Sequence, residues 1–355
     1  MNEERPITGK VLVTGASGHV GANVVRRLLA DGVEVRALVE PGANDRALAG
    51  LSIEHVSGDI RDPEAVDRAV RGVSRVFHVA AKISTINALH QELRDLYAIN
   101  VLGTRYVMQA ALRHGVTRVV LTGSFSAVGY DPDDPTQPST PELPFYPFDA
   151  ATMPYARTKA LAEHELLKAV VDGLDAVIAT SCACIGPWDY LPSRIGKTLC
   201  DYADGRFRAF IPGGFPFVRA EDLADGHVRA MTRGRRGQKY IFATAFHTMD
   251  EMVAMFAEAT GLHRRMLRLP PRLLSAVTNV YAGAIGKRFP KIPQRLTPSA
   301  IRVLELGRRA DTTRAQEELG WRPTNMQDAI RDAYEFFARE GMTRGAARAS
   351  APAPA

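Results

Sequence analysis

Lys10-Val11-Leu12-Val13-Thr14-Gly15-Ala16-Ser17-Gly18-His19-Val20-Gly21 decides the fold of this chain of 355 residues. The apolar run at its start is typical of a short buried strand, and it leads straight into a glycine-rich turn. From Val20 onward, apolar residues recur at helical spacing as far as Asp31-Gly32, and a second strand pattern follows at 33–39. Strand, helix and strand together predict a complete βαβ unit.

Each glycine of this turn has a separate use. Gly15 permits the tight turn, Gly18 lets the backbone approach a pyrophosphate, and Gly21 allows the helix to pack closely on the strand. The helix N-terminus adds amide donors and a positive dipole end. We therefore interpret the segment as a dinucleotide-binding turn rather than an ordinary glycine-rich turn. The predicted cofactor contacts here are Gly15, Ser17, Gly18, His19, Val20 and Gly21.

Glu40 closes the second strand pattern, where a carboxylate can accept hydrogen bonds from the adenosine ribose and would repel a 2′-phosphate. This favours NAD as the cofactor over NADP. The alternative stays open, because Arg36 and Arg46 are close in sequence and could bind a phosphate. Glu40 could also be a solvated residue at the end of the strand.

Tyr155 and Lys159 are one helical turn apart, so they share a face of the predicted helix. A nearby ammonium favours the ionised phenol. A free tyrosine has a pKa near ~10, and lowering it to ~7 needs roughly 4 kcal/mol, which a close cation and an oxidised nicotinamide could supply. The pair alone arises by chance in many chains. Downstream of a dinucleotide-binding turn, it predicts proton transfer beside the cofactor.

With these residues in hand, the chain resembles the extended short-chain dehydrogenase/reductase superfamily, also called the NAD-dependent epimerase/dehydratase family. Within it, the dihydroflavonol-reductase-like and hopanoid-associated epimerase branch is the most similar. Besides the glycine turn, the segments that carry the resemblance are 58–62 (GDIRD), 78–81 (HVAA), 100–104 (NVLGT), 121–129 (LTGSFSAVG), 155–159 (YARTK), 185–187 (IGP), 217–224 (FVRAEDLA), 311–315 (DTTRA) and 319–321 (LGW).

The resemblance implies a role for further residues. Ser124 is selected as the catalytic hydroxyl by its five-residue step to Gly129, and it completes a triad with Tyr155 and Lys159. Tyr155 would exchange the proton of the reacting oxygen, Ser124 would fix that oxygen, and Lys159 would hold the nicotinamide ribose. The further cofactor contacts that the resemblance implies are Asp59, Ile60, Ala80, Ala81, Asn100 and Cys182.

Departures from the family pattern narrow the reaction. Phe125 and Ser126 replace the acidic pair of sugar-nucleotide dehydratases, and Phe215 stands where epimerases commonly place an Arg for the substrate diphosphate. With Phe217 and the apolar segment at 273–285, this favours a reductase or dehydrogenase acting on the ketone or alcohol of a hydrophobic or mid-sized substrate. Two alternatives remain: a sugar epimerase and a non-catalytic dinucleotide sensor. Reductase-like members carry Arg at the position of Glu40, which leaves NADP open.

Strand and helix patterns alternate to about residue 185, which predicts a Rossmann-type, doubly wound parallel α/β sheet. We assign residues 1–187 to the NAD(P)-binding domain, with later strands returning to it, 188–342 mainly to a smaller substrate-binding lobe, and 343–355 to a disordered tail. Residues 131–147 predict a loop over Tyr155. The remaining predicted strands are 53–56, 75–79, 118–122 and 176–179, and the remaining predicted helices are 63–70, 89–114 and 154–171.

The amino-acid composition limits the location of the protein and the partners it can bind. Three cysteines match no zinc spacing and are too few for a disulfide framework, and no apolar run is long enough to span a membrane. We expect a cytoplasmic protein with no metal, no membrane insertion and no nucleic-acid partner. Residues 261–355 hold seventeen Lys or Arg against eight Asp or Glu, which suggests either a solvated surface or a site for an anionic substrate or acidic carrier. The family resemblance implies a homodimer through helices near 97–114 and 155–171.

Overall fold

A computed structural model describes residues 5–83, 90–145, 152–270 and 303–343. Its larger part is built on a parallel sheet of seven strands in the order β10-β6-β5-β4-β1-β2-β3. The predicted doubly wound α/β fold is therefore confirmed. The strands are β1 (Val11–Thr14), β2 (Val35–Val39), β3 (Glu54–Ser57), β4 (Arg75–His78), β5 (Arg118–Ser124), β6 (Ala176–Ser181) and β10 (Lys239–Phe242).

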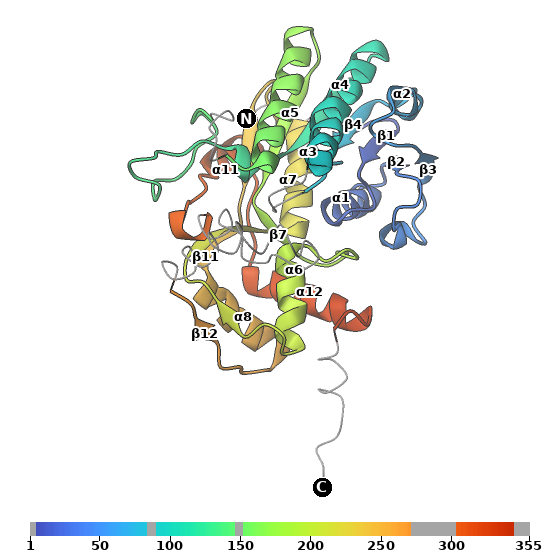
Figure 1. Ribbon diagram of the computed structural model, residues 1–355. Coiled ribbons are helices and arrows are strands. Elements are labelled where there is room, and N and C mark those ends of the chain that lie inside the picture. Colours follow the sequence, from blue (N-terminus) through green and yellow to red (C-terminus); the bar gives the residue numbers. More distant parts are fainter. Residues whose placement is uncertain (1–4, 84–89, 146–151, 271–302, 344–355) are drawn as a thin grey trace.

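Helices cover both faces of this sheet (Figure 1). Successive side chains of a strand point to opposite faces, so Val11 and Val13 enter one core while Leu12 enters the other. The first face carries α1 (His19–Ala30), α7 (Ala220–Arg233) and α11 (Thr313–Leu319). The second carries α2 (Pro63–Val70), α4 (Gly103–Arg113) and α5 (Pro154–Val171). The short helices η1 (Arg46–Leu48) and η3 (Phe125–Ala127) lie in connections.

The smaller lobe has its own core of buried aromatic and aliphatic side chains, among them Tyr202, Phe256 and Phe336. A helix between two strands of this lobe starts with a capping box formed by Thr248 and Glu251. The helices are α6 (Arg194–Ala203), α8 (Met249–Thr260) and α12 (Met326–Arg339), and the strands are β7 (Ala183–Ile185), β8 (Ala209–Phe210), β9 (Gly214–Arg219), β11 (Ala245–Thr248) and β12 (Leu267–Arg268).

The chain returns to the large sheet after residue 187. α7 packs on α1, and β10 extends the sheet beside β6. α11 then packs on α7, and the fully buried Trp321 donates its indole N–H to the carbonyl oxygen of Asp222 at 2.8 Å. The Asp222 carboxylate also accepts hydrogen bonds from the backbone and hydroxyl of Thr324. These contacts hold the two lobes together beside the carboxyl ends of the strands.

One predicted helix differs from the structure. The spacing over 89–114 predicted a single helix, but α3 (His90–Tyr97) and α4 are joined by η2, a π-helical turn over Ala98–Leu102. Such a turn inserts one extra residue per hydrogen-bonded loop and leaves the apolar spacing almost unchanged. The predicted loop is irregular as far as residue 145, apart from a bridge between Ser139 and Ala310. The predicted segment 273–285 and the tail beyond Thr343 lie outside the described residues.

Candidate functional site

The glycine turn between β1 and α1 has the geometry that its sequence predicted. Gly15 has a φ of 66°, and a Cβ there would lie 2.7 Å from the backbone of Ala80. At Gly21, a Cβ would lie 2.1 Å from the carbonyl oxygen of Gly15. Both positions therefore need glycine, the first for the turn and the second for the contact between helix and strand.

Gly18 differs from its neighbours because it faces open space. It is exposed, and a Cβ there would approach one atom only, the Gly15 carbonyl oxygen, at 3.4 Å. It is also the N-cap of α1, and no side chain caps the first amides of the helix. Ser17, His19 and Val20 border the same turn and are partly exposed. Free amides at a helix N-terminus with room above them suit a pyrophosphate, so the turn fits a dinucleotide.

At the end of β2, the exposed Glu40 lies near a cation that sequence reasoning missed. Arg61 donates to both carboxylate oxygens of Asp59 and lies 3.6 Å from a carboxylate oxygen of Glu40. The Arg61 guanidinium holds the pKa of Asp59 below its usual range. The segment 58–62 was singled out for Asp59 and Ile60, and its Asp-x-Arg spacing was the signal for this pair.

The two arginines that could have favoured NADP are bound elsewhere. Arg36 pairs with Glu54 and donates to the carbonyl oxygens of Ala69 and Arg71. Arg46 pairs with Glu340 and lies over the ring of Tyr190 in the smaller lobe. Neither interaction directs a guanidinium toward Glu40.

The segment after β4 is held by a chain of hydrogen bonds through the buried His78. The amide of Ala80 donates to the hydroxyl oxygen of Thr14, which lies 2.7 Å from His78 Nδ1. On the other side, His78 Nε2 lies 2.9 Å from the hydroxyl of Thr104, which donates to the carbonyl oxygen of Asn100. This pattern fixes a neutral imidazole that donates from Nε2 and accepts at Nδ1. Burial lowers the pKa of His78 to about 3.

Asn100 lies in the π-helical turn η2 and is almost fully buried. Its side-chain oxygen accepts from the backbone of Lys82, and its amide donates to the Lys82 carbonyl and the Thr158 hydroxyl. Thr158 in turn donates to the carbonyl oxygen of Tyr155. Asn100 thus joins the segment after Ala80 and Ala81 to the first turn of α5. Sequence reasoning missed His78, Thr104 and Thr158, whose only signal was their place in segments already singled out.

The structure brings Ser124 and Tyr155 together. Ser124 is the last residue of β5, Tyr155 is the second residue of α5, and the Ser124 hydroxyl lies close enough to the phenol to affect its pKa. Ser124 Oγ also lies 2.8 Å from Ser126 Oγ. Burial raises the pKa of Tyr155 above its ordinary value, and the hydrogen bond with Ser124 opposes that rise. The lowered pKa that the sequence predicts for Tyr155 includes the charge of an oxidised nicotinamide, so it stays a prediction for the protein with bound cofactor.

Lys159 is bound to the strand that carries Ser124. Its Nζ donates to the carbonyl oxygen of Thr122 at 2.7 Å, and the side chain is buried between α5 and β5. Burial lowers the pKa of Lys159 to about 8, and the Glu163 carboxylate opposes that fall. The ammonium therefore faces the backbone of the strand that carries Ser124, one helical turn from Tyr155.

Cys182 follows β6 and is buried, and its amide donates to the carbonyl oxygen of Phe242. Burial raises the pKa of its thiol. Phe217 was expected on the substrate side, but it is fully buried in the core of the smaller lobe. Phe215, partly exposed beside it with ring centroids 4.3 Å apart, still can face a substrate.

Arg308 is another residue that the sequence did not indicate. It donates to the carbonyl oxygens of Val128 and Gly129 and to the hydroxyl of Ser139. Its guanidinium also lies 4.6 Å from the ring of Phe125, the residue after Ser124. It therefore ties the irregular loop that follows β5 to the C-terminal part of the chain.

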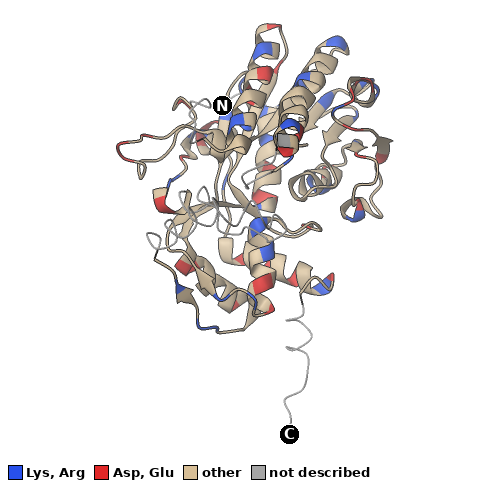
Figure 2. Ribbon diagram, viewed as in Figure 1, with Lys and Arg blue, Asp and Glu red and all other residues tan. Residues whose placement is uncertain are grey.

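The described ranges contain no group of three or more His, Cys, Asp or Glu side chains that could hold a metal ion. Among the helices of these ranges, none combines the length and apolar character needed to cross a bilayer. Figure 2 shows Lys and Arg interleaved with Asp and Glu along the helices of both lobes.

Comparison with known proteins places this geometry in a family. The model of the NAD dependent epimerase/dehydratase family matches residues 11–245. Sterol demethylase protein B of Methylococcus capsulatus is 41% identical over 331 residues, covering 93% of this chain and 99% of its own. A Synechocystis protein provisionally named dihydroflavonol 4-reductase is 31% identical over 340 residues, covering 94% and 95% of the two chains.

A solved structure agrees over almost the whole length. The crystal structure of gox2253 superposes with a TM-score of 0.81 at 29% identity, covering 95% of this chain and all of the other. The match includes the smaller lobe as well as the sheet, because so little of either chain is left out. The resemblance that the sequence indicated is confirmed, including its branch.

Proposed function

Because the chain belongs to the NAD-dependent epimerase/dehydratase family, we propose that it is a dehydrogenase or reductase that interconverts a secondary alcohol and a ketone. The observation that carries the proposal is that Ser124 at the end of β5 lies beside the Tyr155 phenol at the start of α5, with the Lys159 ammonium one helical turn away. The bound nicotinamide would accept or donate the hydride. The rest of the chemistry is proton transfer and positioning, which these three side chains can perform.

In alcohol oxidation, Tyr155 takes the proton of the substrate hydroxyl as the carbinol carbon loses its hydride. Ser124 donates to the same oxygen and fixes it opposite the phenol. Lys159 supplies positive charge that favours the ionised phenol. Burial raises the pKa of Tyr155, so the phenol needs that charge and the charge of an oxidised nicotinamide before it can act as a base near neutral pH.

We propose a polycyclic, mostly apolar alcohol as the substrate, with a sterol as the first candidate. The names of the two curated relatives refer to a sterol and to a dihydroflavonol, and both are fused-ring compounds that carry hydroxyl groups. Phe215 is partly exposed on the smaller lobe at the position where a diphosphate would need a cation. An aromatic side chain there suits a ring system better than a nucleotide sugar.

The test is turnover by the purified protein. NAD⁺ with a panel of 3β-hydroxysteroids and dihydroflavonols should yield NADH, followed by its absorbance. Tyr155→Phe and Ser124→Ala should lower kcat by about 100-fold or more while dinucleotide binding persists. Ser126→Ala is the matched control and should keep most of the activity. Firmly bound NAD without net turnover, together with interconversion of UDP-sugars, would identify an epimerase instead.

We propose NAD rather than NADP as the cofactor. Glu40 is exposed at the end of β2, where its carboxylate would face an adenosine ribose, and Arg36 and Arg46 are paired with Glu54 and Glu340. A carboxylate favours two ribose hydroxyls and repels a phosphate. Mass spectrometry of the protein purified under mild conditions would identify the dinucleotide that it retains.

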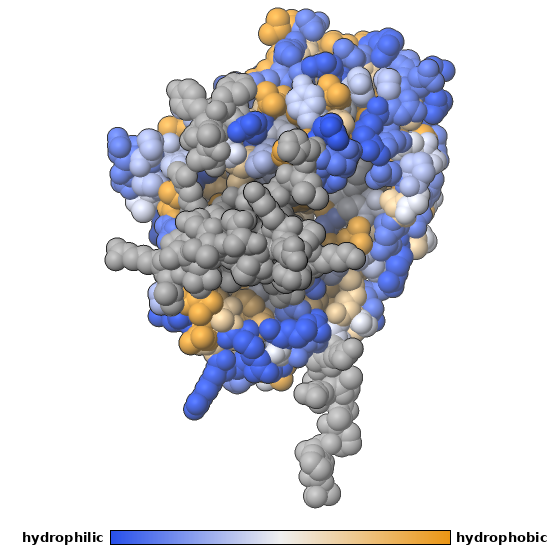
Figure 3. Space-filling model, viewed as in Figure 1, coloured by the Kyte–Doolittle hydropathy of each residue, from blue (hydrophilic) through white to orange (hydrophobic). Residues whose placement is uncertain are grey.

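We also propose a homodimer through α3, α4 and α5. Large apolar side chains are exposed on two of these helices, Tyr97 on α3 and Leu167 and Val171 on α5, and Figure 3 shows single hydrophobic residues among hydrophilic ones over this part of the surface. Leu167→Arg should convert a dimer into a monomer in light scattering without changing circular dichroism. A wild-type protein that is already monomeric would contradict this proposal.

A further inference from the structure

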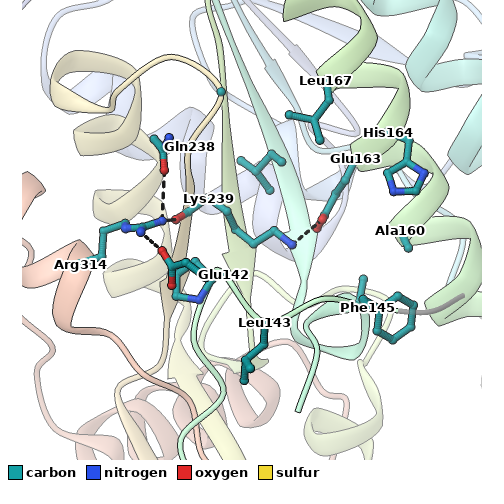
Figure 4. A pocket seen from close by; sticks show the side chains of 14 residues that line it. Glu142, Leu143, Phe145, Ala160, Glu163, His164, Leu167, Gln238, Lys239 and Arg314 are labelled. Atoms are coloured by element: carbon teal, nitrogen blue, oxygen red, sulfur yellow. Dashed lines mark hydrogen bonds and ion pairs between the residues drawn. The ribbon is translucent and has the colours of Figure 1, made fainter. Parts of the chain in front are cut away.

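Glu163 is a buried carboxylate that the triad does not explain. It lies on α5 one helical turn after Lys159 and is only 5% exposed. Its Oε2 pairs with Nζ of Lys239 on β10 at 2.6 Å, as Figure 4 shows. Its Oε1 is buried without a hydrogen-bond partner among the described residues. An unpaired buried carboxylate oxygen is costly, so its retention calls for a reason.

The unpaired Oε1 of Glu163 faces β5, the strand to which Lys159 is hydrogen-bonded. A Cβ built on Gly123 would lie 3.1 Å from Glu163 Oε1 and 2.7 Å from the hydroxyl of Thr180, which is also buried without a partner in the described part. Thr122, the residue before Gly123, accepts the hydrogen bond of Lys159 Nζ. The Lys159 ammonium and the unpaired Glu163 oxygen thus lie beside consecutive residues of β5, Thr122 and Gly123. Because residue 123 is glycine, no side chain fills the space next to the carboxylate oxygen.

On its other side, Glu163 lines a partly open cavity of about 310 Å³. The wall also includes Ala160, His164 and Lys239, with Arg314 and Glu142 paired at its edge (Figure 4). One water molecule needs only about 10–15 Å³ of such volume. Glu163 therefore stands between the buried Lys159 and a space that water can fill.

Two other buried polar side chains of the site, His78 and Asn100, have no free position for a proton. Both nitrogens of His78 are hydrogen-bonded, and the side-chain oxygen and amide of Asn100 are taken by Lys82 and Thr158. Asn100 cannot ionise. Within the described ranges, Glu163 is thus the ionisable side chain near Lys159 that keeps an unused oxygen.

The charged groups around Glu163 make a proton exchange with Lys159 feasible. Lys239 faces it from β10, and Lys159 and His164 face it from its own helix. Burial raises the pKa of Glu163, and the Lys239 and Lys159 ammonium groups oppose that rise. Burial also lowers the pKa of Lys159 to about 8. The two shifts bring the proton affinities of acid and amine toward each other.

We propose that Glu163 relays the proton of each catalytic cycle from Lys159 to the water of the cavity behind α5. The inference rests on the proposed function. Oxidation of one alcohol passes one hydride to NAD⁺ and one proton to Tyr155. The Lys159 ammonium gives one of its protons to the Glu163 carboxylate, which releases it to water, and Tyr155 passes its new proton to Lys159, so that Lys159 ends the cycle as an ammonium and only O–H and N–H bonds exchange. Reduction runs the same path inward, and Glu163 acts on the chemistry only through Lys159.

A test without substrate follows proton release when NAD⁺ binds, by stopped-flow with a pH indicator at pH 8. The cationic ring should favour the ionised phenol and expel one proton from the pair of Tyr155 and Lys159, and in the wild-type protein release should keep pace with binding. In Glu163→Gln release should lag by about tenfold or more, and Glu163→Asp should recover at least part of the rate. Glu165→Gln is the matched control, because Glu165 is a buried carboxylate of the same helix paired with Arg105 and Lys168. It should behave as wild type.

Two results overturn the relay: release as fast in Glu163→Gln as in the wild type, or no release in the wild type. If Glu163→Gln does not fold, Lys239→Met serves instead. Removal of the Lys239 cation raises the pKa of Glu163 further and makes its carboxyl a weaker proton donor to water, so release should again lag. Unchanged release in Lys239→Met would count against the relay in the same way.

Turnover of a 3β-hydroxysteroid gives the second test. In Glu163→Gln, kcat should fall about tenfold at an unchanged KM, the solvent deuterium isotope effect on kcat should rise, and added formate or imidazole should restore part of the rate. If Glu163 had only a structural role, its substitution would not change the solvent isotope effect on kcat, and added formate or imidazole would not restore the rate. If no alcohol is oxidised but proton release still lags in Glu163→Gln, the proposed function fails and the relay stands. Normal turnover of Glu163→Gln with an unchanged isotope effect would support the proposed function and refute the relay.

Discussion

Gly18 and Gly21 lie three residues apart in one turn, yet they tolerate a side chain very differently. A Cβ at Gly21 would overlap the Gly15 carbonyl oxygen at 2.1 Å, whereas Gly18 has a φ of −77° and space above it. Gly21→Ala should therefore lower the free energy of unfolding by at least about 3 kcal/mol, because backbone must move. Denaturation in urea measures this change. A Gly21→Ala protein as stable as the wild type would show that the turn is looser than the structure indicates.

Gly18→Ala should have the opposite profile. The folded protein should keep its stability within about 1 kcal/mol, because alanine fits this backbone conformation. Its methyl group would occupy the space expected for the pyrophosphate, so NAD affinity should fall about tenfold or more, equivalent to about 1.4 kcal/mol. Calorimetric titration with NAD⁺ measures it. Unchanged affinity would move the dinucleotide away from this turn.

Cofactor preference depends on Glu40 and its neighbour Arg61. With the carboxylate removed in Glu40→Ala, the repulsion of a 2′-phosphate disappears, and Arg61, 3.6 Å from that carboxylate in the wild type, can attract the phosphate while it stays paired with Asp59. We expect the ratio of NADPH to NADH affinity to rise about tenfold. Arg46→Ala is the control, since Arg46 pairs with Glu340 and should not affect the ratio. An unchanged ratio in Glu40→Ala would place the ribose elsewhere.

Single residues could be predicted where backbone geometry determines them. The roles of Gly15 and Gly21 follow from the space a turn leaves, and the structure agrees with both. The burial that raises the pKa of Tyr155 and the partner of Lys159 Nζ could not be predicted, because both depend on how α5 packs on β5. Helical spacing gives the shared face of two side chains and leaves their partners on a strand undetermined.

At the scale of the element, the π-helical turn η2 positions Asn100 for its three hydrogen bonds. Asn100→Ala should leave the backbone amide of Lys82 and its carbonyl without their partners. The loss should cost about 1–3 kcal/mol of stability and speed hydrogen exchange at the Lys82 amide. Exchange followed by mass spectrometry would detect this. Protection as strong as in the wild type would show that Asn100 does not hold this segment.

The π-helical turn η2 also shows which feature of a helix cannot be predicted from the local sequence pattern. The helix over 154–171 was predicted with its observed ends, because Pro154 fits its first turn and Asp172 and Gly173 follow its last. The helix over 89–114 was predicted as one element, because a π-helical turn changes the apolar spacing by a single residue. The hydrogen bonds of Asn100 hold the irregular turn. Two of them are made with the backbone of Lys82, so they form only when the chain around Lys82 is in place.

At the scale of the whole molecule, the order of strands and helices to residue 185 was readable from their alternation. The return of α7, β10 and α11 to the large sheet was readable only in outline. Their contacts join residues far apart in sequence, as where Trp321 reaches Asp222. The core that α1 shares with α7 therefore depends on the closing segment of the chain as well as on the first βαβ unit.

Two buried imidazoles in the large part make the fold sensitive to acid. His78 lies between Thr14 and Thr104, and His227 donates from Nδ1 to the Leu223 carbonyl and accepts at Nε2 from Thr122. Burial lowers the pKa of His78 to about 3 and that of His227 to about 4. Because both values are depressed in the folded state, the unfolded chain binds more protons once the pH falls below about 6.5.

Stability should therefore be complete above pH 6.5 and fall on acidification, by about 2 kcal/mol for each histidine at pH 5. The loss continues until the pH passes below the folded pKa values, where acidic groups also begin to titrate. Urea denaturation at pH 7, 6 and 5 measures the slope, and His227→Asn should reduce that slope by one proton even though it weakens the fold at every pH. A free energy of unfolding that is constant from pH 7 to pH 5 would mean that water or a compensating charge reaches both imidazoles, and the sheet around Thr122 would then be more open than its packing indicates.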